Sequence, residues 1–191
     1  MKKADITVTN IMHAFNQLIR TSAFDGITVN DIIGEAGVSR ATFYRHFRDK
    51  YDVMNYNFTA LLDGVLSGGK IHTMQDVFLM LLTAGKQSWP QLKSLFNTTG
   101  ANSLHDHISS YSYTAAQNIY TTGTAAGDGP VIRELTEAEK IQLKIFCHGA
   151  ALFFEEWVKG KYRLCAEEAA AAMYELLPES LRGVLPMHET K

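Results

Sequence analysis

The stretch from Thr28 to Lys50, TVNDIIGEAGVSRATFYRHFRDK, allows fewer folds than any other part of this chain. Apolar residues recur at helical spacing in its first third, and Thr28 followed by Asp31 is a capping-box pattern that predicts a helix start. Gly37 then predicts a turn, because glycine adopts a left-handed backbone at little steric cost. Ser39 is a favourable N-cap for a second short helix. The stretch therefore predicts a helix-turn-helix.

The second of these helices carries side chains that suit DNA. Phe43 and Phe47 lie one turn apart and are expected to pack inward, which leaves small and polar residues outside. Arginine reads guanine edges, a small residue can approach a thymine methyl group, and hydroxyl groups reach phosphates. Lys50 opens the next helix, where a cation and free backbone N–H groups favour a phosphate. The residues expected at base edges are Arg40, Ala41 and Thr42, and those expected at phosphates are Thr28, Ser39, Tyr44, His46 and Lys50.

The run T-x-x-x-I-x-x-x-A-G-V-S-R-A-T-F-Y-R-H-F-x-x-K resembles the DNA-binding signature of TetR/AcrR-type transcriptional regulators. The turn, the aromatic core positions and the Tyr and Lys phosphate positions all coincide with that signature. The resemblance implies a homodimer that binds a palindromic operator, most often as a repressor, and that a small amphipathic effector releases. It also implies that a fourth helix links the DNA-reading domain to a C-terminal ligand-binding and dimerisation domain.

Composition is that of an ordinary globular protein, but charge is unevenly distributed. The 191 residues are 46% hydrophobic and carry a net charge of −2. Residues 1–50 hold seven Lys/Arg and five Asp/Glu, so a basic excess lies where the helix-turn-helix is predicted. No apolar stretch approaches the roughly 20 residues that span a bilayer, and Cys147 and Cys165 do not resemble a disulfide framework. We therefore expect a cytoplasmic protein.

The pattern along the chain predicts an all-α fold. Apolar residues recur every three to four positions in nine segments, which are bounded by Gly, Pro and capping residues. The predicted helices cover residues 5–22, 28–36, 39–47, 49–66, 73–89, 91–97, 103–120, 136–159 and 167–177. Thr136 with Glu139 is a second capping-box pattern. We expect a helix-turn-helix domain over residues 1–50 and a helical ligand-binding and dimerisation domain over residues 51–191.

The last two long helices combine small residues, which let helices approach closely, with aromatic anchors. We expect them to form a dimer interface, because paired helix-turn-helix units gain affinity and selectivity on a two-fold operator. Burial of the same stripe within one chain is the alternative. The interface candidates are Phe146, Gly149, Ala150, Phe153, Trp157, Ala169 and Met173.

The middle helices are expected, from the resemblance, to enclose a pocket for a small amphipathic effector. Their aromatic and hydroxyl side chains would suit such a ligand, whereas plain core packing is the alternative for each residue taken alone. The pocket candidates are Phe58, Leu62, Phe78, Leu82, Trp89, Phe96, Tyr111, Tyr113, Tyr120, Phe146 and Phe154. A protein partner in place of a small ligand is a further alternative.

Chemistry other than DNA binding finds little support in the sequence. His105 and His107 stand two apart on a predicted helix, so they point to different sides and cannot chelate a metal as an i, i+4 pair can. Cys147 lies on an apolar helix and is expected in the core. No phosphate-binding loop, dinucleotide fingerprint or nucleophile elbow is present, so we expect no catalytic residue, metal or cofactor.

Two alternative functions stay open. One is a TetR-type activator whose second domain binds a protein. The other is an all-helical enzyme with a residual DNA-binding head, in which His105 or Cys147 would act.

Overall fold

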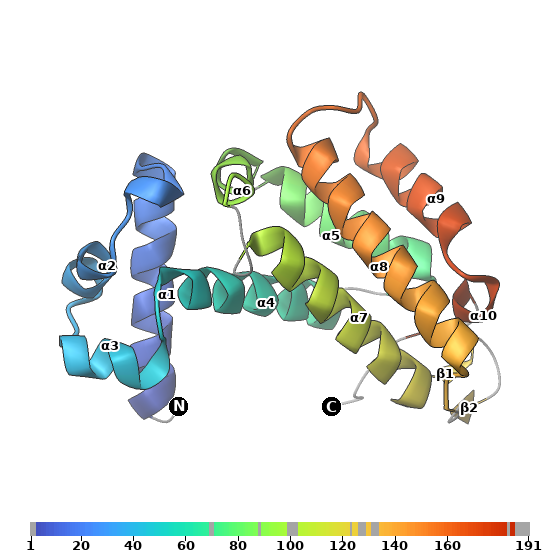
Figure 1. Ribbon diagram of the computed structural model, residues 1–191, viewed down its shortest axis with the longest axis horizontal. Helices are drawn as coiled ribbons and strands as arrows, with labels where there is room; N and C mark the ends of the chain where they lie inside the picture. The colour runs from blue at the N-terminus through green and yellow to red at the C-terminus, as the bar shows by residue number, and fades with distance from the viewer. Residues whose placement is uncertain are drawn as a thin grey trace. The chain divides into compact units, whose positions relative to one another are not determined.

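The regular structure of the described residues is almost entirely helical (Figure 1). The computed structural model describes residues 3–68, 71–87, 89–98, 103–122, 124–125, 129–130, 134–182 and 184–185. The α-helices are α1 (Lys3–Thr21), α2 (Val29–Ala36), α3 (Arg40–His46), α4 (Lys50–Gly68), α5 (Met74–Gln87), α6 (Trp89–Leu95), α7 (Leu104–Thr122), α8 (Glu137–Val158), α9 (Ala166–Leu176) and α10 (Glu179–Arg182), with a 3-10 helix, η1 (Phe24–Gly26). The predicted all-α class is confirmed.

Helices α1 to α9 match the nine predicted helices, with ends that differ by no more than two residues. Helix α10 and three two-residue strands were not predicted, because segments this short complete no apolar period. The strands are β1 (Thr124–Ala125), β2 (Gly129–Pro130) and β3 (Val184–Leu185), which pair antiparallel in the order β2-β1-β3. A turn-rich segment thus pairs with the end of the chain.

Two compact units divide the chain. The first comprises Met1–Leu61 and Pro90–Leu104, and the second comprises Leu62–Trp89 and His105–Lys191. Part of α6 belongs to the first unit, where the Phe24 N–H donates to the Ser94 hydroxyl oxygen at 2.9 Å. The division between the two units falls within α4, between Leu61 and Leu62.

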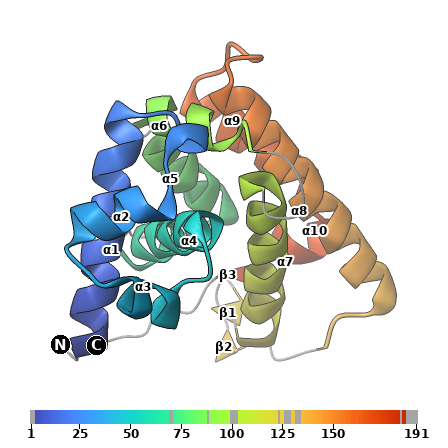
Figure 2. The same cartoon turned by 60° about the vertical axis from the view of Figure 1, so that its left-hand side comes forward.

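The first unit has an aromatic core that holds the helix-turn-helix. Helix α1 packs along α2, and α2 lies against α3 (Figure 2). Phe24 sits edge-on to Phe15 and Tyr51, with ring centroids 6.1 and 5.3 Å away. Phe43 and Phe47 are buried at 0% and 3% exposure, which confirms that they pack inward. A rigid core of this kind fixes the side of α3 that faces solvent.

In the second unit, α5 packs against both α8 and α9. The interior contains Leu82 of α5, Leu143 and Trp157 of α8, and Ala169 and Ala170 of α9. Alanine at the α5–α9 contact allows the two backbones to approach closely. Among the described residues of the chain, no helix is both long enough and apolar enough to cross a bilayer.

Gly37 ends α2 in a conformation that other residues adopt with strain. Its φ of 63° and ψ of 32° are left-handed, and the next N–H, of Val38, donates to the Ile33 carbonyl oxygen at 3.3 Å. Gly37→Ala should therefore lower the free energy of unfolding by about 1–2 kcal/mol, measured by chemical denaturation. Gly34→Ala is the matched control, because a Cβ there meets nothing within 4 Å and helical alanine is favoured by up to about 1 kcal/mol. Equal stability of both variants would contradict this role for Gly37.

Candidate nucleic-acid interface

The N-terminus of α2 is closed by the predicted capping box. The Asp31 N–H donates to the Thr28 hydroxyl oxygen at 3.2 Å, and the Thr28 N–H donates to the Asp31 carboxylate at 2.8 Å. The Thr28 hydroxyl also donates to that carboxylate at 2.7 Å. These hydrogen bonds hold the pKa of Asp31 below its usual value, with the side-chain bond from Thr28 as the largest cause. The cap therefore stabilises the fold above the usual carboxyl pKa and is lost as the pH falls through the lowered pKa.

This cap bears on the expectation that Thr28 holds a phosphate. Its hydroxyl both donates and accepts within the box, and the Asp31 carboxylate beside it is an anion. A negative charge at this helix end repels a phosphate. The geometry thus favours a structural role for Thr28, although the residue is exposed.

Helix α3 begins at the predicted N-cap. The Ser39 hydroxyl oxygen accepts from the Thr42 N–H at 3.1 Å, and the two hydroxyl groups lie 2.8 Å apart. Ser39, Arg40, Ala41 and Tyr44 are exposed, whereas Thr42 and His46 are half-buried. The exposed side of α3 therefore presents small, hydroxyl and cationic side chains together.

Arg40 is held by residues on two helices. Its Nη1 donates to the Asn30 Oδ1 of α2 at 3.0 Å, and its Nη2 donates to the Tyr44 hydroxyl oxygen at 3.4 Å. Its Cζ lies 5.4 Å from the centre of the Tyr44 ring, within the range of a cation–π contact. Asn30 was missed in the sequence, because the turn geometry that brings it to Arg40 cannot be read from spacing.

Lys50 makes contacts that differ from those the sequence indicates. Its ammonium donates to the carbonyl oxygens of Phe24, Asp25 and Ile27 at 2.9, 3.2 and 2.9 Å. It also lies 4.5 Å from the centre of the Phe24 ring. An ammonium has three N–H donors, so these contacts use all of them. In this structure the Lys50 ammonium is hydrogen-bonded to the loop before α2 and is not free to bind a phosphate.

The predicted pocket residues are divided between the two units. Phe58 and Phe96 belong to the first unit, whereas the other candidates belong to the second. Phe78 and Leu82 are buried, and the Phe78 and Phe146 ring centroids lie 5.9 Å apart. Leu62, Tyr111, Tyr113 and Phe154 are half-buried. The side chains of Trp89 and Tyr120 lie outside the described part of the structure.

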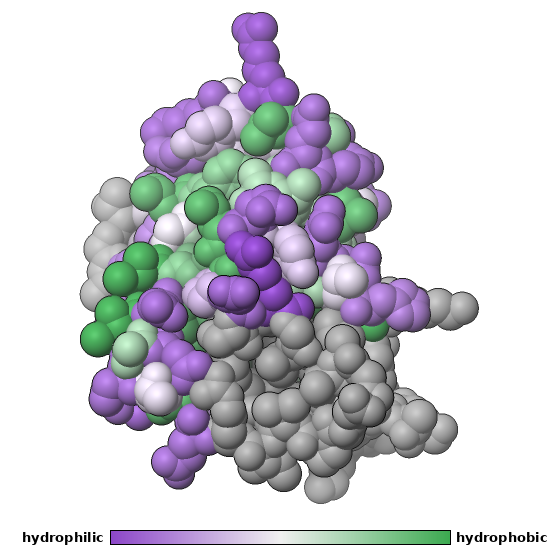
Figure 3. Space-filling view, turned by 90° about the vertical axis from the view of Figure 1, so that its right-hand side faces the viewer, coloured by the Kyte–Doolittle hydropathy of each residue, from purple (hydrophilic) through white to green (hydrophobic). Residues whose placement is uncertain are grey.

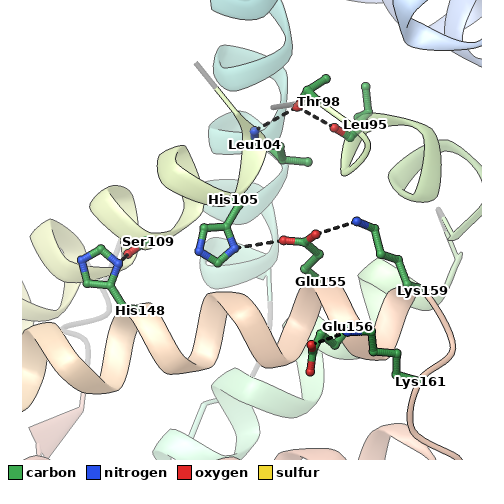
Figure 4. Close-up of polar contacts among 10 residues, drawn as sticks. All are labelled: Leu95, Thr98, Leu104, His105, Ser109, His148, Glu155, Glu156, Lys159 and Lys161. Carbon is green, nitrogen blue, oxygen red and sulfur yellow. Dashed lines mark hydrogen bonds and ion pairs between the residues drawn. The ribbon is translucent and has the colours of Figure 1, made fainter. Parts of the chain in front are cut away.

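A polar seam joins α7 and α8 in the second unit (Figure 4). His105 Nδ1 lies 3.0 Å from the Glu155 carboxylate, which also accepts from the Lys159 ammonium at 2.6 Å. One turn along, the Ser109 hydroxyl lies 2.6 Å from His148 Nδ1. On another side of α7, the Tyr111 hydroxyl donates to the Asp63 carboxylate of α4, and burial followed by that bond raises the pKa of Tyr111. Polar contacts thus tie α7 to α8 and to the second half of α4.

The residues considered for chemistry other than DNA binding all lie in the second unit. His105 is paired with Glu155, and the His107 ring stacks on Tyr111 with centroids 6.3 Å apart. Cys147 is buried, and desolvation raises the pKa of its thiol to about 12. A thiol with that pKa stays protonated near neutral pH and is a poor nucleophile.

The structure places two of the dimer candidates inside the chain. Trp157 and Ala169 are both 0% exposed, and the Trp157 indole N–H donates to the Leu164 carbonyl oxygen at 2.9 Å. They are therefore not available to a partner, because packing within the second unit covers them. Phe146, Ala150, Phe153 and Met173 are half-buried, and Gly149 is exposed.

A different stripe of α8 is open to solvent. Ile141, Ile145 and Leu152 are 59%, 68% and 49% exposed, and their spacing of four and seven residues puts them, with Gly149, on one helix face. On α9, Leu176 is 77% exposed. Figure 3 views the molecule from the side of α8 and α9 and shows hydrophobic side chains gathered among polar ones. We name Ile141, Ile145, Gly149 and Leu152 the α8 stripe.

Comparison with known proteins agrees with the geometry of the first unit. The sequence profile of the bacterial regulatory proteins of the tetR family matches residues 11–56, which span the end of α1 through the start of α4. The HTH-type dhaKLM operon transcriptional activator DhaS of Lactococcus lactis subsp. lactis (strain IL1403) is 36% identical over 58 residues, which are 30% of this chain and 31% of that protein. The matched region therefore spans about a third of that relative's length.

Two solved structures share the fold over nearly the whole chain. A dihydroxyacetone kinase operon activator DhaS superposes with a TM-score of 0.59 and 16% identity, covering 91% of this chain and 94% of that one. A TetR transcriptional regulator from Streptococcus agalactiae 2603V superposes with a TM-score of 0.57 and 18% identity, covering 90% and 93%. The profile match and the helix-turn-helix geometry agree: the chain carries the DNA-binding domain of the tetR family over residues 11–56, within a fold that it shares with these two regulators.

Proposed function

We propose that the chain is a homodimeric regulator that binds a two-fold-symmetric DNA operator through α3 and is released by a small-molecule effector. The observation that carries the proposal is the outward face of α3, where Arg40, Ala41 and Tyr44 are exposed over the buried ring of Phe43. A recognition helix of this kind places its exposed side chains at base edges. The buried Phe43 ring on its opposite face holds the helix in one orientation.

Roles for the individual side chains follow from their surroundings. Arg40, Ala41 and Thr42 are proposed at base edges, and Ser39, Tyr44 and His46 at phosphates. For Thr28 and Lys50 we now propose a supporting role, since their polar groups are engaged by Asp31 and by three backbone carbonyls.

The dimer is proposed to form through the α8 stripe. Its isoleucine and leucine side chains are the largest apolar groups that the described part of α8 leaves in solvent. A second copy of the chain is the occupant that DNA recognition requires, because pairing two α3 helices matches two half-sites about one helical turn apart. The small exposed residue Gly149 lets the partner helix approach closely.

The effector is proposed to act in a domain that follows the DNA-binding domain, with the division expected near residue 50. Among the pocket candidates, Phe78, Leu82, Tyr111, Tyr113 and Phe146 share the second unit. The Tyr111 hydroxyl donates to Asp63 in the C-terminal half of α4. A ligand that displaced Tyr111 would therefore release this half of α4, the helix that follows α3 in the chain. Tighter binding of the ligand to the state in which Tyr111 has left Asp63 would supply the coupling.

Arg40→Ala tests the DNA-reading role. A duplex library with a randomised core, enriched on the wild-type protein, supplies the operator for the measurement. The variant should lose about 1–3 kcal/mol of binding free energy on that operator and relax the preference at one base pair of each half-site. Fluorescence anisotropy with operators changed one base pair at a time measures both. A variant that bound them all like wild type would contradict the assignment of Arg40.

The matched relative DhaS is an operon activator, which favours an activator as the second candidate. We propose that the chain's second domain would bind a protein partner in place of a small ligand. Transcription from a promoter that carries the enriched operator, with purified RNA polymerase, separates the two. A repressor lowers the transcript when the protein is added, and an activator raises it.

A further inference from the structure

The guanidinium of Arg40 has two hydrogen-bond partners within the protein. Its Nη1 donates to the Asn30 Oδ1 at 3.0 Å and its Nη2 to the Tyr44 hydroxyl oxygen at 3.4 Å. Tyr44 stands one turn along α3, whereas Asn30 comes from α2 across the turn. Arg40 is thus held from two helices, with its Cζ 5.4 Å from the Tyr44 ring centre.

A free arginine side chain on a surface helix samples many rotamers, and it loses that freedom when it binds a base. Asn30 and Tyr44 restrict the side chain in advance, so less entropy is lost when Arg40 meets DNA. The restriction also sets the direction in which the guanidinium points. Direction decides which base edge can be read, because a bidentate contact tolerates little misalignment.

The guanidinium has enough N–H donors to keep its hydrogen bonds within the protein and to bind a base at the same time. A guanidinium has five N–H donors, and the contacts to Asn30 and Tyr44 use two of them. Three remain, and the major-groove edge of guanine offers two acceptors, O6 and N7. Arg40 can therefore read a guanine without leaving Asn30.

We infer that Asn30 is a positioning residue for recognition of a guanine by Arg40, an inference that rests on the proposed function. Asn30 acts on sequence preference without touching the base. The arrangement makes α2 contribute to specificity, in addition to its place in the helix-turn-helix core.

Two substitutions of Asn30 separate positioning from a direct contact with DNA. Asn30→Ala removes the acceptor for Nη1. It should lower the preference for guanine about two- to fivefold, as expected for an exposed polar contact. The affected base pair should be the one at which Arg40→Ala relaxes the preference. Asn30→Asp keeps an acceptor for Nη1, so it should retain the preference while its charge weakens binding to every duplex alike. In an Arg40→Ala background, Asn30→Ala should cause no further change in preference.

The measurement is fluorescence anisotropy on the enriched operator, on its single-base-pair variants and on a scrambled duplex. Asn10→Ala, an exposed asparagine of α1, is the matched control and should behave like wild type. The inference is overturned if Asn30→Ala weakens all duplexes equally, changes a different base pair, or changes nothing. Failure of the wild-type protein to prefer any operator would instead overturn the proposed function itself.

Discussion

Ile145→Lys should turn the proposed dimer into monomers. Ile145 is 68% exposed and lies in the middle of the α8 stripe, between Ile141 and Leu152. In a two-fold interface the substitution occurs twice, so two ammonium groups would lose water without gaining a partner. A buried unpaired charge costs at least about 3 kcal/mol, which raises the dimer dissociation constant by more than about a hundredfold.

Light scattering coupled to size-exclusion chromatography at micromolar concentration measures this change directly. Ile6→Lys is the matched control, because Ile6 is also an exposed isoleucine, 46% exposed on α1, and its substitution should leave the mass of the dimer unchanged. Operator binding by Ile145→Lys should weaken about tenfold or more, since two half-sites no longer bind as one unit. If Ile145→Lys remains a dimer with wild-type affinity, the interface lies on another surface.

Lys50→Met should destabilise the first unit by about 2–3 kcal/mol. Methionine keeps the aliphatic length but leaves the carbonyl oxygens of Phe24, Asp25 and Ile27 without their charged donor. Hydrogen bonds to charged groups contribute more than neutral ones, and the contact with the Phe24 ring is lost as well. Denaturant unfolding followed by circular dichroism measures the change.

Arg48→Met is the control for charge. Its side chain is 87% exposed and pairs only loosely with Asp52, at 3.5 Å, so its loss should change stability by no more than about 0.5 kcal/mol. The same variants test the phosphate role that the sequence indicates for Lys50. If Lys50→Met unfolds like wild type but lowers the salt dependence of DNA binding by about one phosphate, Lys50 binds DNA and the supporting role is wrong.

Local features were predictable from the sequence because they depend on neighbouring residues. The capping boxes at Thr28 and Thr136, the N-cap at Ser39 and the left-handed Gly37 are all confirmed. The box at Cys165, whose sulfur accepts from the Glu168 N–H at 3.4 Å, was missed because cysteine is an unusual N-cap.

Contacts between distant residues were not predictable in the same way. The bonds of Lys50 to the loop before α2, and of Arg40 to Asn30, depend on how the helices turn toward one another. Periodicity identifies an apolar helix face but not what covers it. Trp157 was therefore assigned to a partner, whereas the structure buries it within its own chain and leaves Ile145 in solvent.

The ratio of two dissociation constants measures sequence-specific binding of DNA directly. The wild-type protein is titrated at physiological salt against the enriched operator and against a scrambled duplex of the same composition. A dimeric helix-turn-helix reader predicts an operator of two inverted half-sites, bound about a thousandfold or more tightly than the scrambled duplex. A ratio near one, or no enrichment of any sequence, would contradict the assignment of α3 as a reader of DNA.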